Sequence, residues 1–186
     1  MASAVDDFSS ALQLLRDHGV EPDGAGVMPG AEVDALEKRL GVRLPPSYKA
    51  MVSRFGFLEF DTVEIYGLVK AGLDAKGIPN VVFATEGDRA KGLISPQMVR
   101  FMDAGYGPSF VLDCALADAA GEAPVFEVSA GGSVEGSDRV ADSFGAFVLA
   151  EAKRLVGLED DAPAPEGTPG REEMSRYWKK RAGDFE

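Results

Sequence analysis

Two helical patterns meet at a pair of prolines in the first third of the chain. Apolar residues recur on one helical face over residues 31–41, and a second apolar stripe follows over residues 46–56. Gly41 and Gly56 end the two stretches. Pro45 disfavours a helical conformation of the residue before it. The pattern therefore predicts two separate helices whose apolar stripes pack against a common partner.

The same periodicity predicts three further helices, over residues 8–16, 96–104 and 143–155. Each follows a residue whose side chain can cap a helix N-terminus: Ser3 or Asp6, Ser95, and Asp142 or Ser143. Gly105 would end the second of these helices.

After residue 56 the apolar residues recur with a period of two, which is typical of strands with one wet face. Strands are predicted over residues 62–67, 110–116 and 124–129, with an edge strand over residues 134–140. The short apolar run 81–84 is also predicted to be a strand, and Glu86-Gly87-Asp88 a turn. Alternation places four side chains on the wet face: Glu64, Tyr66, Asp113 and Glu127. The predicted fold class is a single α+β domain, a mostly antiparallel twisted sheet packed by helices.

The length of 186 residues suits one domain with a complete core, which we assign to residues 1–156. Residues 157–171 are rich in Pro, Gly and acids and are predicted to be a linker. Residues 172–186 would form a short helical or disordered tail that brings Met174, Tyr177 and Trp178 together. This tail would dock either back on the domain or on another molecule.

The formal net charge of −12 is concentrated in the middle of the chain, where residues 59–138 carry 13 acids against 5 bases. Such a charge attracts basic partners and disfavours nucleic acid as a ligand. No apolar run is long enough to span a membrane, and the N-terminus lacks a leader pattern. With Cys114 as the single cysteine, these features favour a cytoplasmic protein.

Catalytic chemistry is poorly represented in the sequence. One histidine, His18, and one cysteine cannot build a zinc or transition-metal site, and no cofactor motif is present. We interpret Cys114 as a small core residue and His18 as a structural or exposed residue. Carboxylates among Glu59, Asp61 and Glu64, or Glu86 with Asp88, could in principle give an acid and a base for glycoside hydrolysis. Because 31 acidic residues give chance pairs, we interpret them as a solvated surface and predict no enzymatic activity.

The helix pair also carries a family resemblance. It rests on Leu36, Glu37, Leu40, Gly41, Leu44, Pro45, Pro46 and Tyr48, with weaker matches at residues 65–68, 110–113, 124–126 and 142–144. Over residues 31–156 the chain resembles the SUKH superfamily of Smi/Knr-like domains. It departs from that pattern at Phe55-Gly56-Phe57, where family members often have Asn-Gly.

The resemblance implies an immunity protein that binds and neutralises a cognate bacterial toxin domain, and that its strands share one sheet. The outward acids would then form an acidic surface suited to a basic nuclease or nucleobase deaminase, bound as a one-to-one complex by a monomer. The candidate partner-binding residues are Glu59, Asp61, Glu64, Tyr66, Glu86, Asp88, Asp113, Asp118, Glu122 and Glu127. The alternative is a regulatory scaffold, as in relatives linked to cell-wall assembly, which would act through the helix pair and residues 157–186.

Overall fold

Six antiparallel strands form one open sheet in which spatial order follows chain order. In the computed structural model, which describes residues 3–105, 107–128 and 137–158, the chain is a single α+β domain, as predicted. The strands are β1 (Leu58–Phe60), β2 (Val63–Ile65), β3 (Met98–Asp103), β4 (Ser109–Asp113), β5 (Val125–Val128) and β6 (Asp138–Ala141).

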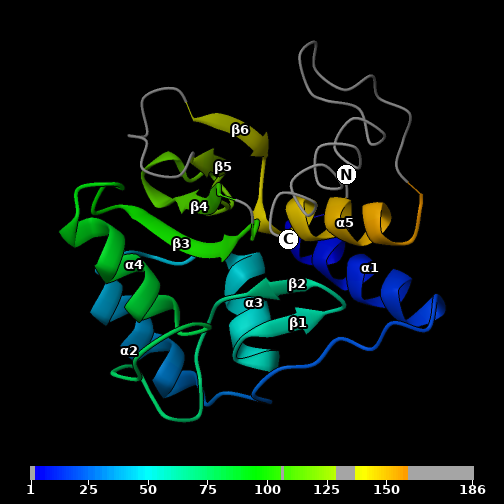
Figure 1. The fold of residues 1–186 in the computed structure, drawn as a ribbon, viewed down its shortest axis with the longest axis horizontal. Coiled ribbons are helices and arrows are strands. Elements are labelled where there is room, and N and C mark those ends of the chain that lie inside the picture. The colour runs from blue at the N-terminus through cyan, green and yellow to red at the C-terminus, as the bar shows by residue number, and fades with distance from the viewer. Residues whose placement is uncertain (1–2, 106, 129–136, 159–186) are drawn as a thin grey trace, which may run out of the picture.

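The described residues also form five α-helices: α1 (Ala4–Asp17), α2 (Gly30–Leu40), α3 (Pro46–Phe55), α4 (Val81–Ala90) and α5 (Phe144–Leu155). Figure 1 shows α1 and α5 side by side at one end of the molecule and α2 and α4 together at the other. Gly145 permits the close approach of the first pair, because a Cβ atom there would overlap the carbonyl oxygen of Ala4.

Local capping signals explain where three helices begin or end. The Ser3 side chain accepts a hydrogen bond from the Asp6 N–H, and the Asp6 carboxylate accepts one from the Ser3 N–H in return. Ser143 caps α5 by accepting from the Ala146 N–H at 3.1 Å. Gly41 ends α2 with a φ of 68°. These predictions from sequence are confirmed.

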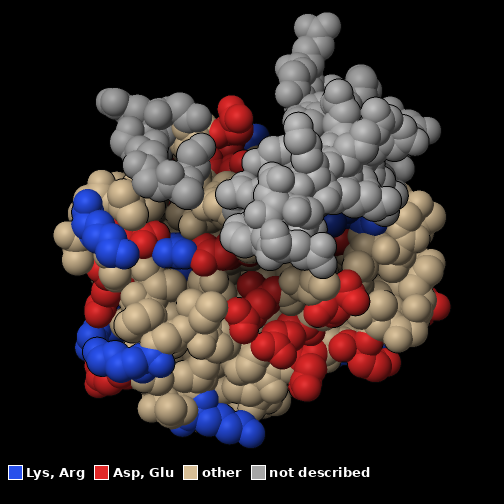
Figure 2. All heavy atoms as spheres, viewed as in Figure 1, with Lys and Arg blue, Asp and Glu red and all other residues tan. Residues whose placement is uncertain are grey.

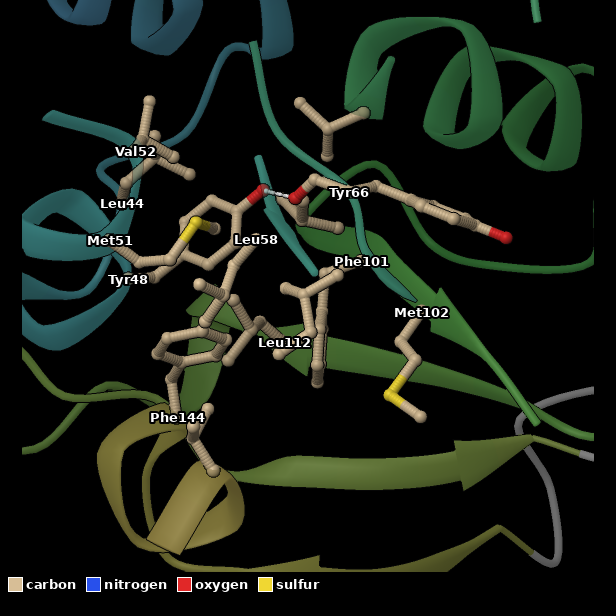
Figure 3. Close-up of a cluster of buried hydrophobic side chains, with 14 of the residues drawn as sticks. Leu44, Tyr48, Met51, Val52, Leu58, Tyr66, Phe101, Met102, Leu112 and Phe144 are labelled. Atoms are coloured by element: carbon tan, nitrogen blue, oxygen red, sulfur yellow. Dashed lines mark hydrogen bonds between the residues drawn. The ribbon is translucent and has the colours of Figure 1, made fainter. Parts of the chain in front are cut away.

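An aromatic cluster joins the helices to the sheet. Tyr48 of α3 and Phe144 of α5 meet edge to face with ring centroids 5.1 Å apart, and Phe101 of β3 lies 5.5 Å from Phe144. The buried Tyr48 hydroxyl donates a hydrogen bond of 2.7 Å to the carbonyl oxygen of Tyr66 (Figure 3). The apolar stripes of the helix pair therefore share the core of the sheet, as their pattern predicted.

Two predicted elements have the wrong type, and both lie between β2 and β4. Residues 81–84 belong to helix α4, and Glu86-Gly87-Asp88 continues that helix. Asn80 supplies the missed start signal, since its side chain accepts from the Val82 N–H at 2.9 Å. Residues 98–103 form strand β3 instead of a helix, because Val99 and Phe101 alternate into the core between β2 and β4.

Helix α4 packs against β3 beside the main core, to which its Val81, Val82 and Ala84 belong. Thr85 on α4 accepts a hydrogen bond from the Arg100 N–H at 3.2 Å. Farther along the same sheet, Ile94, Met98, Val111 and Val128 form a second, smaller apolar cluster. The sheet is thus covered on both faces around β3 and is less open than the alternation pattern suggested.

The remaining predictions fall partly outside the described residues. The hairpin of β4 and β5 is confirmed, although Cys114–Leu116 form a 3₁₀ turn instead of extending β4. Cys114 packs partly against the core, and burial raises the pKa of its thiol to about 12, which keeps the thiol protonated. Residues 134–136 of the predicted edge strand, and the tail and most of the linker, at residues 159–186, lie outside the described part of the chain.

Candidate functional site

The β1–β2 hairpin presents three carboxylates. Glu59 and Glu64 lie directly opposite each other in the strand register, and the residues on either side of each are buried. Alternation therefore turns both glutamates away from the core. Asp61 lies in the two-residue turn with a φ of 52°, a left-handed conformation that aspartate tolerates better than most residues. We refer to Glu59, Asp61 and Glu64 as the hairpin acidic cluster.

The charges of this cluster repel one another. Burial raises the pKa of Glu64, and the carboxylates of Glu59 and Asp103 raise it further. Within the described ranges no Lys or Arg forms an ion pair with a member of the cluster. Like charges directly opposite each other destabilise a strand pair. Repulsion within the hairpin acidic cluster therefore lowers the stability of the domain, and a cationic partner would relieve it.

Acidic side chains gather around the hairpin on one face of the molecule. Figure 2 shows them over β1, β2 and the neighbouring α1, whereas the Lys and Arg side chains on the same face lie mainly over α2, α4 and the nearby loops. This separation gives that face an acidic side and a basic side, and the resulting electric field can orient a charged partner during encounter.

Tyr66 was predicted to be an exposed anchor within this surface, and that is wrong. Its side chain is buried, with 2% exposure, and its hydroxyl donates a hydrogen bond of 2.9 Å to the Asp103 carboxylate. Burial, followed by the charge of Asp103, raises the pKa of Tyr66. The prediction fails because it extended the strand alternation to Tyr66, whereas β2 ends at Ile65.

Asp88 was also predicted to lie on the rim, but it is buried in α4. Both of its carboxylate oxygens accept hydrogen bonds from Arg100, at 2.9 and 3.0 Å. The same guanidinium binds Asp103. Burial by itself would raise the pKa of Asp103, but hydrogen bonds from Arg100 and Ser109 outweigh it and hold that pKa below its ordinary value. These groups tie α4 to β3 and are structural.

Glu122 is the third residue wrongly predicted to be exposed. Its buried carboxylate accepts hydrogen bonds from the backbone N–H and the hydroxyl of Ser47, in the first turn of α3. A carboxylate at this position satisfies a free N–H and suits the positive end of the helix dipole. Glu122 therefore fastens the loop before β5 to α3.

Three other candidates lie at the surface but away from the hairpin. Glu86 pairs with Arg39 of α2 at 2.6 Å, and this hydrogen bond lowers the pKa of Glu86. Asp113 caps the 3₁₀ turn after β4 by accepting from the Ala115 N–H. Asp118 accepts from backbone N–H groups of its own turn. The role of these residues in partner binding stays a prediction.

Glu127 opens onto a groove beside the hairpin. The groove lies between one end of the sheet and α5, and its volume is about 490 Å³. It is lined by Thr62, Val63, Met102, Asp103, Ala104, Phe110, Glu127, Val140, Phe147, Ala150, Glu151 and Arg154. Since Thr62 follows Asp61 in the same turn, the groove adjoins the hairpin acidic cluster.

Sequence reasoning missed Asp103 and the groove because both depend on β3. A helix over residues 96–104 would have placed Asp103 far from Glu64, whereas strand pairing of Ile65 with Met102 brings them close. The structure thus brings Glu59, Asp61, Glu64 and Asp103 together and places Glu127 across the groove.

Two surveys of the described residues bear on other functions. None of the helices there has the length and hydropathy needed to cross a bilayer. The same residues contain no group of three or more His, Cys, Asp and Glu side chains arranged to hold a metal ion.

A helix pair joined at two prolines, an antiparallel sheet and a closing helix define an α+β domain of the SUKH type. A family model described as SUKH_6, SMI1-KNR4 cell-wall, matches residues 31–148, more than half of the chain. The chain belongs to this family, and the match begins at the residue where the resemblance was placed. No curated protein matches the chain.

Proposed function

We propose that this protein is an immunity protein, which binds the catalytic domain of a cognate toxin and neutralises it in the cytoplasm of the cell that makes both. Members of the SUKH superfamily commonly act in this way, and the chain is a member of a SUKH family. The proposed partner is a basic nuclease or nucleobase deaminase domain, bound one to one.

The observation that carries this proposal is the charge of the hairpin acidic cluster, with which no Lys or Arg in the described part of the chain forms an ion pair. Glu59 and Glu64 face each other although like charges destabilise a strand pair, and a third acid occupies the turn between them. A domain that needed only to fold would gain stability from a cation in this register. Selection for binding a positively charged surface explains why acids stand there.

Inhibition would need no bond-making step. An enzyme that acts on nucleic acid binds phosphates with Lys and Arg, and an acidic hairpin can bind the same basic groups. The field of the acidic face would speed the encounter, with an effect that salt weakens. Glu127 would extend the contact across the groove, whereas the buried Tyr66, Asp88 and Glu122 would support the surface from beneath.

The test is binding to the toxin domain encoded beside this gene. The double variant Glu59→Lys/Asp61→Lys changes two exposed residues of the cluster. The variant Glu32→Lys/Asp34→Lys makes the same charge change at exposed positions of α2. We expect the first to slow association by about tenfold or more at low salt and to abolish protection, and the second to have little effect. Equal effects of the two variants would remove the hairpin from the mechanism.

A further inference from the structure

The groove beside the hairpin has an apolar floor and a charged rim. Met102, Phe110 and Phe147 contribute apolar surface, while Glu127 and Glu151 lie at its edges. Of the three carboxylates among the lining residues, Asp103 is bound by Arg100 and Glu151 by Arg154, whereas Glu127 forms no ion pair with another described residue. The hairpin acidic cluster adjoins the groove through Thr62. At about 490 Å³ the groove is in the size range of pockets that hold a large organic group, about 300–1,000 Å³.

An occupant that fits this lining would combine aromatic rings with positive charge. The sequence supplies such a segment in residues 171–181, REEMSRYWKKR, with five Lys and Arg residues against two glutamates in a chain of net charge −12. Tyr177 and Trp178 stand between basic residues on both sides. Flat amphipathic rings suit the apolar side chains of the lining, and the flanking cations suit Glu127 and the adjoining hairpin acidic cluster.

Chain connectivity brings this segment within reach of the groove. Glu151 and Arg154 of the rim belong to α5, which ends at Leu155. The 20 residues from Leu158 to Trp178 can span at most about 70 Å, whereas the helical rise from Ala150 to the end of α5 is only about 8 Å. A tethered segment of this length has an effective concentration in the millimolar range, so weak contacts suffice to hold it.

We propose that residues 171–181 bind this groove within the same molecule, with Trp178 against its apolar lining and the flanking basic residues near Glu127 and the hairpin acidic cluster. The segment would then lie next to the hairpin acidic cluster and act as a basic ligand within the same molecule. This inference is independent of the toxin-binding proposal, and its test uses no partner.

Trp178 is the only tryptophan in the chain, so its fluorescence reports on this contact directly. In the native full-length protein we expect a blue-shifted emission and acrylamide quenching several-fold weaker than in denaturant. Ala150→Arg adds bulk and positive charge to an exposed position that lines the groove. We expect it to raise quenching towards the denatured value. Ala90→Arg, at an exposed position of α4 outside the groove, is the matched control and should change nothing.

Three outcomes would overturn the proposal. Acrylamide could quench Trp178 in the native protein as strongly as in denaturant, Ala150→Arg could leave this quenching unchanged, or Ala150→Arg and Ala90→Arg could change it equally. Protection that disappears on dilution would also overturn it, in favour of exchange between two copies of the chain. Circular dichroism checks that both variants fold. If Ala150→Arg does not fold, Glu127→Lys on the opposite rim provides the same test, with Glu32→Lys as its control.

Discussion

The Glu122 carboxylate accepts two hydrogen bonds from Ser47, one from its backbone N–H at 2.8 Å and one from its hydroxyl at 2.6 Å. The Gly145 N–H donates to that same hydroxyl at 3.2 Å. One buried carboxylate thus connects the loop before β5 with the starts of α3 and α5. The connection explains why a charged side chain is retained in an otherwise apolar region.

The first prediction concerns this connection. Glu122→Ala leaves the buried Ser47 N–H without its acceptor, and we expect it to lower the free energy of unfolding by about 1–3 kcal/mol. Glu122→Gln keeps one acceptor and should cost less. Urea unfolding followed by circular dichroism measures both, with Glu32→Gln at the surface as the control. If Glu122→Ala left the free energy of unfolding unchanged, Glu122 would not fasten α3.

The second prediction is a gain of stability from Glu64→Gln. Because burial and the nearby carboxylates raise the pKa of Glu64, the folded state binds this proton more tightly than the unfolded state. Stability therefore falls as pH rises from the ordinary glutamate range through the raised pKa of Glu64. At neutral pH the substitution should add roughly 0.2–1 kcal/mol, towards the lower end because solvent screens the pair.

The difference in stability is measured by thermal unfolding of the wild type and of Glu64→Gln at about pH 4–8, where carboxylates and histidine titrate. The gain should shrink at the acid end, where the wild-type carboxyl is already protonated. A gain that persisted unchanged at acid pH would contradict the assignment of the cost to Glu64 ionisation. On the proposed function, the same substitution should weaken toxin binding, so stability and affinity should move in opposite directions.

The third prediction concerns Arg100, which binds the carboxylates of Asp88 and Asp103. Arg100→Met would leave both carboxylates without their cation beneath α4. Since Arg100 is 21% exposed, we expect a loss of about 2–3 kcal/mol, below the about 3–5 kcal/mol typical of a fully buried pair. The double variant Arg100→Met/Asp88→Leu should recover part of this loss. Urea unfolding of the three proteins tests the coupling, and additive effects would refute it.

The fourth prediction contrasts two glycines in helices. Gly145→Ala places a Cβ against the Ala4 carbonyl and should cost about 1–3 kcal/mol, because α1 has to move away from α5. Gly87, in the interior of α4, has open space around it, so Gly87→Ala should add up to about 1 kcal/mol through helix propensity. Melting temperatures that move in the same direction would show that the α1–α5 contact adapts more readily than its geometry implies.

Sequence reasoning succeeded where the signal was local. Ser3 and Ser143 cap helices within three residues of themselves, and Gly41 ends α2 through its own backbone angle. It failed where a short apolar run could serve either structure. A strand was predicted over residues 81–84, which form a helix, and a helix was predicted over residues 98–102, which form a strand. Only contacts with distant elements decide between the two structures.

Two errors at the candidate site have separate causes. Asp88 was assigned to the surface because residues 86–88 were taken as a turn and not as part of α4. Tyr66 was assigned there because alternation was extended beyond Ile65, where β2 ends. Glu64 was placed correctly, because alternation along β2 is a local property. Glu59 belongs to β1, a strand that the sequence pattern did not predict. The groove could not be predicted, since residues from five strands and α5 meet there only through tertiary folding.

The last prediction joins the two proposals. If residues 171–181 occupy the groove beside the hairpin acidic cluster, a basic toxin domain that binds this cluster must compete with them. Adding the toxin domain should then make Trp178 more accessible to acrylamide, and Trp178→Ala should raise the affinity for the toxin, because less of the binding free energy is spent on displacing the segment. Titration followed by calorimetry measures the affinity, with Tyr106→Ala as a control for loss of an aromatic residue outside the segment. A lower affinity of Trp178→Ala would mean that the segment contacts the toxin itself, whereas an unchanged affinity would mean that groove and hairpin act separately.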